Sequence, residues 1–237
     1  MKYLKKYYYL FTGAAAFIVY LFTIAPTVIQ IDSGELAAVQ ATLGIAHPTG
    51  YPLFTILGYV FSLIPLPFTK IFQLNLLAAI YCASAVSIFT YTINLILKNW
   101  KEFIQQKNVK QKTKKKKNVK DEKKETAFSE NIILIASVFG GLALAFSKTF
   151  WFQSTSVEVY SLHLLLMSVI ILFLTNAYLQ PKENSSNKLW FYFAIVLALG
   201  FTNHMTTLLI LPGVAFLYFK KYGFKYTRMD AKRMRFI

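Results

Sequence analysis

Long apolar segments, separated by short polar stretches, are the feature that most constrains how this chain folds. Of its 237 residues, 56% are hydrophobic, although one segment is dominated by lysine. Soluble domains usually contain fewer apolar residues, about 45–50% with glycine included, whereas a membrane helix needs about 20 consecutive, mainly apolar residues. The sequence therefore predicts an all-α integral membrane protein. Its apolar segments are residues 7–28, 53–68, 71–97, 132–146, 160–179, 189–201 and 206–219.

The distribution of positive charge indicates which segments cross the membrane, because cytoplasmic loops are enriched in Lys and Arg. Segment 53–68 is short and bounded by prolines, which favours a re-entrant or juxtamembrane helix over a span. If this segment does not cross and the N-terminus is cytoplasmic, only Lys70 and Lys148 of the 26 Lys and Arg residues lie outside. We therefore predict six transmembrane helices, both termini inside, and a long first outer loop that contains the re-entrant helix.

This topology divides the chain into four parts. Residues 1–97 hold two membrane helices and the first outer loop, with a catalytic loop at about 30–70, and residues 131–219 hold four membrane helices. Residues 98–130 form a Lys-rich linker whose dense like charge opposes packing. We expect the linker to be disordered, cytoplasmic and in contact with anionic lipids, and residues 220–237 to form a basic cytoplasmic tail. A nucleic-acid partner is not expected, because no aromatic or folded reading surface accompanies the lysines.

Acids and histidines of separate segments fall at the same predicted face of the membrane. The predicted topology places Asp32, Glu35 and Glu158 outside, together with His47 and His204. A charge at membrane depth is costly unless it faces a polar cavity or finds a partner. The sequence therefore predicts a shared polar cavity at the outer face.

The first outer loop has both a structural and a functional interpretation. Asp32 can cap a helix, with Glu35 closing a capping box and Gly44 ending the helix. Alternatively, because no lysine lies near them in the sequence, these carboxylates can take a proton from an acceptor hydroxyl or hold a metal ion. Asp32 and Glu35 are therefore the candidate catalytic residues. A divalent metal is a conceivable cofactor, and none is certain.

Further polar and aromatic residues are candidates for binding substrate. The turn His47-Pro-Thr-Gly-Tyr51-Pro is rigid because of its two prolines, and it is either a structural elbow or a contact for a phosphate or sugar hydroxyl. Aromatic residues are enriched at any membrane interface, and polar residues between two spans can simply cap helices. The predicted binding residues are His47, Tyr51, Glu158, Tyr160, Asn203 and His204.

Several of these motifs together resemble a bacterial membrane family catalogued as a domain of unknown function. They are DSGE at 32–35, GIAHPTGYP at 44–52, NLLA at 75–78, the run 150–162 and GFTNH at 200–204. That family includes a eukaryotic protein O-mannosyltransferase acting on plexin and receptor ectodomains, and it belongs to the GT-C class of membrane glycosyltransferases. The resemblance covers about residues 23–212.

The resemblance implies the N-terminal half of a GT-C fold in the inner membrane, with its active site facing outside or the periplasm. It also implies a polyprenyl-phosphate-linked sugar as donor and an exported protein or glycan as acceptor. In such a mechanism Asp32 accepts the proton of the acceptor, while His47, His204 and Lys148 neutralise the leaving phosphate. The lysine-rich linker and the small number of spans depart from this class. A non-catalytic or split subunit therefore stays open, as does a lipid or solute transporter, although the apolar midplane disfavours transport.

Overall fold

The computed structural model describes residues 2–29, 31–104, 128–181 and 188–223. Within these ranges all regular structure is helical, which confirms the predicted all-α class. The elements are α1 (Lys2–Leu21), α2 (Ser33–Thr42), α3 (Pro52–Ser62), α4 (Lys70–Lys98), α5 (Trp100–Ile104), α6 (Glu130–Ala145), α7 (Lys148–Ser154), α8 (Val159–Leu179), α9 (Lys188–Asn203), the 3₁₀ helix η1 (Met205–Ile210) and α10 (Leu211–Tyr222).

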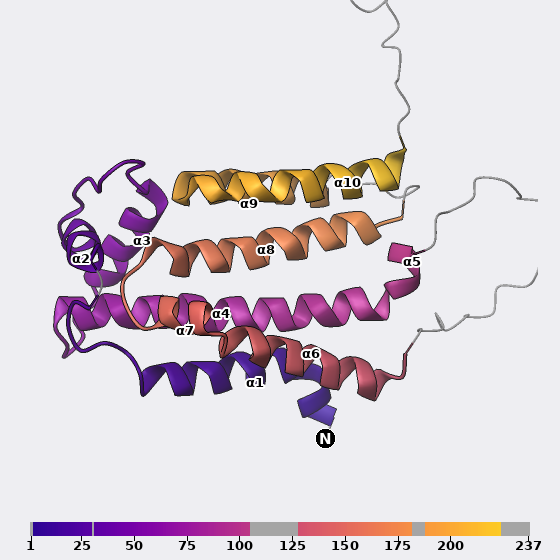
Figure 1. Cartoon of the computed structure of the whole chain (residues 1–237), viewed down its shortest axis with the longest axis horizontal. Coiled ribbons are helices and arrows are strands. Elements are labelled where there is room, and N and C mark those ends of the chain that lie inside the picture. The colour runs from indigo at the N-terminus through magenta and orange to yellow at the C-terminus, as the bar shows by residue number, and fades with distance from the viewer. Residues whose placement is uncertain (1, 30, 105–127, 182–187, 224–237) are drawn as a thin grey trace, which may run out of the picture.

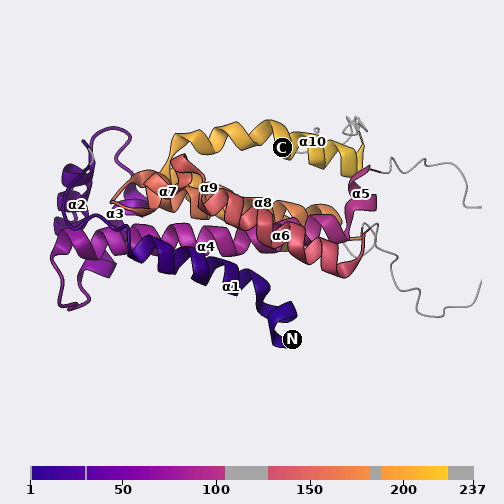
Figure 2. The same cartoon turned by 60° about the horizontal axis from the view of Figure 1, so that its bottom comes forward.

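The long helices lie side by side and alternate in direction along the chain (Figures 1 and 2). The central helix is α4, which packs against α1, α6 and α8. Helices α2 and α3 lie together at one end of the bundle, hereafter the α2–α3 end, and α5 lies at the other, the α5 end (Figure 1). The described elements that flank the Lys-rich linker, α5 and the start of α6, both lie at the α5 end, as the predicted topology requires.

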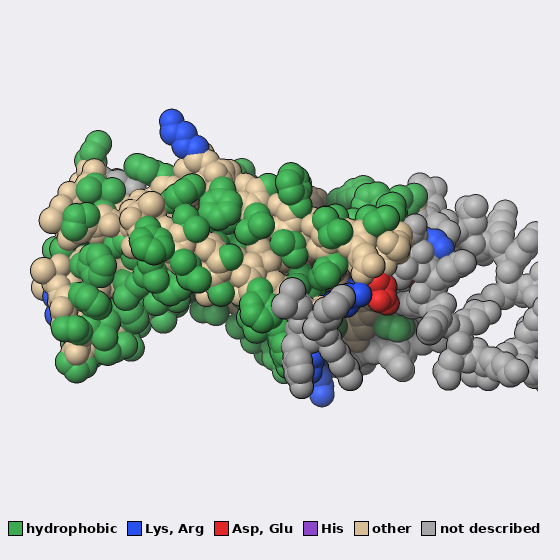
Figure 3. All heavy atoms as spheres, turned by 90° about the horizontal axis from the view of Figure 1, so that it is seen from below, with side chains coloured by type: hydrophobic (Ala, Val, Ile, Leu, Met, Phe, Trp, Pro, Cys, Tyr) green, Lys and Arg blue, Asp and Glu red, His purple; other side chains and the backbone are tan. Residues whose placement is uncertain are grey.

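Two helices, α4 and α8, are long and apolar enough by themselves to cross a membrane. A third span is obtained if α6 and α7, which are bent by 68° relative to each other, are counted as one broken segment. The other predicted spans correspond to α1, which carries Lys5 and Lys6 in its first turns, and to the shorter elements α9 and η1–α10. Figure 3 shows hydrophobic side chains along the length of one face, with acidic ones visible only near the α5 end.

Helix α3 is shorter than the predicted re-entrant segment. Its 11 residues reach about 17 Å at 1.5 Å per residue, well below the ~30 Å of a bilayer core. The helix begins with Pro52 at its first turn, and the carbonyls at its end are bound by side chains of α4: Gln73 donates to Phe61 and Ile64, and Lys70 donates to Ser62. The end of α3 is therefore held against the start of α4, and α3 alone is too short to span a bilayer core.

Other boundaries differ from the sequence prediction in informative ways. Helix α7 lies where an outer turn is expected, and the last apolar segment divides into η1 and α10 just before Pro212. A short helix, α5 (Trp100–Ile104), occupies the start of the predicted linker. The rest of the linker through residue 127, the turn at 182–187 and the tail from 224 lie outside the described residues.

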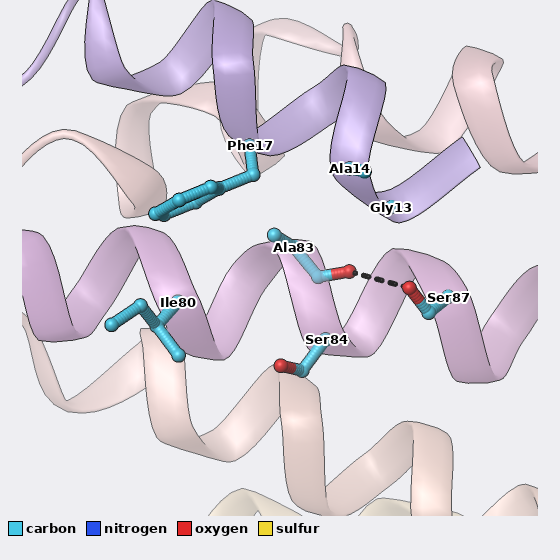
Figure 4. A pocket seen from close by; sticks show the side chains of 7 residues that line it. All are labelled: Gly13, Ala14, Phe17, Ile80, Ala83, Ser84 and Ser87. Carbon is cyan, nitrogen blue, oxygen red and sulfur yellow. Dashed lines mark hydrogen bonds between the residues drawn. The ribbon is translucent and has the colours of Figure 1, made fainter. Parts of the chain in front are cut away.

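Close contact between α1 and α4 depends on Gly13. A Cβ at this position would lie 1.8 Å from Ser87 Oγ and 2.8 Å from the Ala83 carbonyl oxygen. Figure 4 shows the small side chains of both helices lining a pocket of about 240 Å³ between them, next to Phe17. The pocket carries no titratable side chain, so it offers no acid–base chemistry.

A second contact region attaches α2 and α3 to the bundle. Leu36 of α2, Phe54 of α3, Leu74 of α4 and Leu162 of α8 belong to one cluster of buried apolar side chains. Burying such a side chain contributes roughly 1.5–3 kcal/mol. The segments that carry the candidate site residues are therefore held on the ends of α4 and α8.

Candidate active site

Asn75 of α4 holds together the two segments on which the candidate acids lie. Its side-chain nitrogen donates to the Ala25 carbonyl at 2.8 Å, and its oxygen accepts the Val157 N–H at 2.8 Å. The Ala25 N–H also donates to the Thr155 carbonyl at 2.9 Å. The chain leading to Asp32 and the chain leading into α8 are thereby fixed against each other. We did not predict this role, although a fully buried Asn in a membrane helix is a recognisable signal.

The predicted capping box is wrong. Asp32 occupies the N-cap position of α2, but its side chain makes no capping hydrogen bond. Glu35 binds His47 instead: one carboxylate oxygen accepts the His47 backbone N–H at 2.8 Å, and the other lies 3.2 Å from His47 Nδ1. The chain can fold back in this way because Leu43, rather than Gly44, adopts the left-handed conformation that ends α2 (φ 53°).

The predicted turn brings Tyr51 back onto His47. The Gly50 N–H donates to the His47 carbonyl at 2.8 Å, and the Tyr51 hydroxyl lies 3.2 Å from His47 Nε2. Gly50 and Tyr51 both have positive φ, 88° and 44°. A bulky residue rarely adopts this left-handed conformation, and such strain is concentrated at functional sites. The turn is therefore both an elbow and a carrier of polar groups.

Aromatic rings from α8 and from the turn before α3 meet at His204, which lies between α9 and η1. Its ring is parallel to that of Tyr51 (centroids 5.8 Å apart, 2° between planes) and lies 5.0 Å from the ring of Tyr160. The Thr206 hydroxyl lies 2.8 Å from His204 Nδ1 and 3.1 Å from His163 Nε2, so it joins the two histidines. Sequence reasoning missed Thr206, because only the tertiary contact with α8 distinguishes it from Thr207.

Asn203, another predicted binding residue, anchors the end of α9 to α8. Its side chain is 1% exposed and donates to the Val159 carbonyl at 3.4 Å. The oxygen of the same side chain, Ser156 Oγ and His163 Nδ1 are buried without a hydrogen-bond partner among the described residues. Buried polar groups are normally paired, so these atoms mark where a water molecule or a ligand group fits.

Glu158 is the buried acid of the site. Only 8% of it is exposed, and its side chain does not cap α8. Burial, and secondarily the negative charge of Asp32, raise the pKa of Glu158 to about 7, while His47 opposes the shift. The two acids are therefore close enough for their charges to interact, and Glu158 exchanges its proton near neutral pH.

Three further groups of the site, Glu35, Tyr51 and His204, each keep one charge state at neutral pH. The hydrogen bonds from His47 lower the pKa of Glu35, which stays ionised. Burial raises the pKa of Tyr51 and lowers that of His204, so both are neutral. The site thus combines a fixed carboxylate, a carboxyl group that can change charge and two neutral rings.

No group of three His, Cys, Asp or Glu side chains within the described ranges is arranged to hold a metal ion. Lys148 lines a pocket of about 420 Å³ together with Phe146, Trp151, Phe152 and Thr155. Trp151 of this pocket donates to the Thr23 hydroxyl at 3.0 Å. None of the other predicted site residues lines this pocket.

Comparison with known proteins identifies a matching family and similar curated proteins. Residues 32–227 match the family described as Protein O-mannosyl-transferase TMEM260 N-terminal domain. A stretch of 45 residues, 19% of this chain, is 56% identical to Protein O-mannosyl-transferase tmem260 of Dictyostelium discoideum, and 63 residues, 26% of the chain, are 43% identical to Protein O-mannosyl-transferase TMEM260 of Mus musculus. The matched stretches span 6% and 9% of those two proteins. No solved structure matches the chain.

Proposed function

Because the chain belongs to the family of TMEM260 O-mannosyl-transferase N-terminal domains, we propose that it transfers mannose from a polyprenyl-phosphate-linked donor to a hydroxyl group of an exported protein or glycan. One observation carries the proposal. Asp32, Glu158, His47, Tyr51 and His204 come from distant parts of the sequence, and their rings or charges interact at the α2–α3 end.

The reaction requires one proton acceptor and no nucleotide site. The acceptor oxygen attacks the anomeric carbon, its proton passes to Asp32, and the bond from the anomeric carbon to the phosphate oxygen breaks. Polyprenyl phosphate leaves with the electron pair. Asp32 is exposed and lies at the mouth of the site, so it can reach an acceptor. Donor groups aimed at the leaving phosphate would stabilise its charge. Both ring nitrogens of His47 are engaged by Glu35 and Tyr51, and Lys148 lines a separate pocket, so we assign this role to protonated Glu158 and leave His204 for the sugar.

Glu158 has a separate part in the proposed reaction. Its carboxyl group has a pKa of about 7, so near neutral pH it is protonated in about half of the molecules. In that state it donates a hydrogen bond to a phosphate or sugar oxygen. Its ionised form would repel the phosphate, so we expect donor binding to weaken above neutral pH.

The proposed orientation places the α2–α3 end at the outer face of the inner membrane. The helices alternate along the bundle (Figure 1), and only Lys70 and Lys148 of all Lys and Arg residues lie away from the predicted cytoplasmic segments. Six spans in this orientation, with the domain boundaries given above, form the N-terminal half of a GT-C fold. Anionic lipids would then meet the Lys-rich linker.

A reconstituted transfer assay tests the proposal. The purified full chain in lipid nanodiscs would be given mannosyl-phosphoryl-polyprenol and Ser- or Thr-containing peptides, with mass spectrometry to detect an added hexose. We expect addition by the wild type and none by Asp32→Asn. Absence of addition by a folded wild-type chain would contradict the proposed activity and favour a non-catalytic subunit.

A further inference from the structure

Glu35 determines which nitrogen of His47 carries a proton. An ionised carboxylate only accepts hydrogen bonds, and Glu35 faces His47 Nδ1 at 3.2 Å. Nδ1 must therefore be the protonated nitrogen. In the neutral ring Nε2 then has a lone pair, which accepts the hydroxyl proton of Tyr51 at 3.2 Å.

This chain of hydrogen bonds leaves the Tyr51 oxygen as an acceptor. Its proton is directed to His47, and a hydroxyl oxygen has two lone pairs. These lone pairs can accept a hydrogen bond from a donor group on a ligand.

In His204 the proton lies on the other ring nitrogen, so this ring offers the ligand a hydrogen-bond donor. The backbone N–H of Thr206 can only donate, and it is directed to His204 Nδ1 at 3.1 Å. Burial keeps the ring neutral by lowering the pKa of His204. Nδ1 therefore has the lone pair and Nε2 the proton, and within the described residues Nε2–H has no hydrogen-bond partner.

The two rings are parallel, with centroids 5.8 Å apart, so the acceptor and the donor belong to neighbouring rings. A hydroxyl group both donates and accepts, and the neighbouring hydroxyls of a sugar ring can satisfy both partners. An ionised phosphate only accepts, so it would meet the lone pair of Tyr51 unfavourably. Tyr51 and His204 together are therefore matched to the sugar, and not to the phosphate, of a polyprenyl-phosphate-linked sugar.

We propose that Tyr51 and His204 form a recognition pair for sugar hydroxyl groups, and that Glu35 is the positioning residue that sets its polarity through His47. This inference rests on the proposed function, which supplies the sugar. It also moves Glu35 from a direct chemical role to an indirect one.

Nitrogen NMR of the ¹⁵N-histidine-labelled chain in nanodiscs tests the polarity without any need for transfer activity. The sequence has three histidines, and a His163→Gln variant assigns the signals. We expect neutral His47 to carry its proton on Nδ1. In Glu35→Gln the amide oxygen must stay on the His47 backbone N–H, so the amide nitrogen faces Nδ1 and donates to it. The His47 proton then moves to Nε2 and is donated to the Tyr51 oxygen. The Tyr51 hydroxyl proton is thereby released, so toward the ligand Tyr51 changes from a hydrogen-bond acceptor to a donor.

Titration with methyl α-D-mannoside tests recognition in the same samples. We expect the sugar to shift the His204 signals, and its affinity to fall roughly 10-fold in Glu35→Gln, the value of one hydrogen bond. Tyr51→Phe should lose the same affinity but leave the His47 proton on Nδ1. The double variant should be no weaker than either single one, because both changes remove the same contact.

The outcomes separate the two proposals. A His47 proton that stays on Nδ1 in Glu35→Gln overturns the positioning role. A mannoside that leaves the wild-type His204 signals unmoved, or additive losses in the double variant, overturns the recognition pair even if transfer occurs. If both NMR results are as expected and the wild type transfers no mannose, the recognition pair stands and the proposed enzymatic activity fails.

Discussion

Polar side chains in the middle of the bundle and at the α2–α3 end make different kinds of hydrogen bond. In the middle, the hydroxyls of Thr12, Thr90 and Ser137 each donate to the carbonyl four residues earlier in the same helix. At the α2–α3 end, Gln40 joins α2 to α3 by donating to the Phe54 carbonyl at 2.9 Å, and Asn75 joins two loops. Hydrogen bonds within one helix satisfy polar groups inside a membrane without linking helices. Hydrogen bonds between elements instead fix the positions of the loops at the α2–α3 end.

The middle of the bundle and the α2–α3 end therefore differ in how their side chains stabilise the structure. Small residues, such as Gly13 against Ser87, let the helices of the middle approach closely. The α2–α3 end instead keeps buried Asn, Gln, His and Glu side chains, whose burial is unfavourable unless they are paired. The following predictions test whether chemistry depends on one region and helix packing on the other.

The largest effect is expected from Asp32→Asn, on activity alone. The change removes the proposed base, and positioned acid–base groups contribute roughly 100- to 10,000-fold to rate. Because the Asp32 side chain does not cap α2, the melting temperature should stay near the wild-type value. Transfer rates and thermal unfolding would be measured on the same preparation.

Glu35→Gln is the matched control for this comparison. It changes the neighbouring carboxylate in the same helix, and we expect a loss of roughly 10-fold, equivalent to one hydrogen bond. A nearly inactive Glu35→Gln beside an active Asp32→Asn would show that the two carboxylates are assigned in the wrong order.

Asn75→Leu should destabilise the α2–α3 end. It leaves the Ala25 carbonyl and the Val157 N–H buried without partners, at about 1–3 kcal/mol for each such group. We expect the free energy of unfolding to fall by roughly 2–4 kcal/mol, measured by denaturant titration in detergent. Asn176→Leu is the matched control, because Asn176 bonds only to Leu172 in its own helix. Equal losses in the two variants would remove the distinction between the regions.

The sequence was sufficient to predict the helices that are continuous and apolar. The expected spans 71–97 and 160–179 match α4 and α8 to within one residue at each end, because each is a long, uninterrupted run of mainly apolar residues. Helix α7 was missed since its seven residues, with Lys148 and aromatic side chains, resemble an interface turn. The division of the last apolar segment into η1 and α10 near Pro212 was missed, because the segment is apolar on both sides of the boundary.

The distribution of Lys and Arg was sufficient to predict that the candidate residues share one face. It could not predict which hydrogen bonds they make. The spacing of Asp32 and Glu35 predicts a capping box. That prediction is wrong because the Glu35 carboxylate binds His47, which lies 12 residues later in the sequence. The contacts of Thr206 with His163 and of Asn75 with Val157 depend on how helices pack. Such long-range pairs leave no periodic signal in one sequence.

Glu158→Gln should remove a pH dependence of stability. The pKa of Glu158 is raised from 4.5 to about 7 by burial and by Asp32, so the folded chain binds more protons than the unfolded one between these values. The free energy of unfolding should therefore fall as pH rises from 4.5 to 7 and then level off, with a contribution of roughly 2–3 kcal/mol. We expect the variant to gain stability relative to wild type across this window.

Unfolding of wild type and variant would be followed from pH 4 to 8 in the same detergent, and only their difference interpreted. His204 contributes with the opposite sign, since burial lowers its pKa, and taking the difference between wild type and variant cancels this contribution. A difference that is constant with pH would show that Glu158 is not protonated near neutrality.

The smallest effect is expected in the middle of the bundle, from Gly13→Ala. Alanine favours a helix by about 1 kcal/mol over glycine, but here its Cβ would meet the Ala83 carbonyl oxygen at 2.8 Å, and a backbone atom cannot rotate away. Overpacking typically costs about 1–3 kcal/mol, so we expect a net loss of roughly 1 kcal/mol in the free energy of unfolding. Gly213→Ala is the control, since within the described part of the chain a Cβ added there meets nothing within 4 Å beyond its own stretch of helix, and it should be neutral or slightly stabilising. Mannose transfer by the folded Gly13→Ala chain should equal that of wild type, because Gly13 contacts none of the site residues. A loss of transfer without a loss of stability would mean that the packing of α1 on α4 sets the geometry of the site, and the two regions would then have to be treated as one.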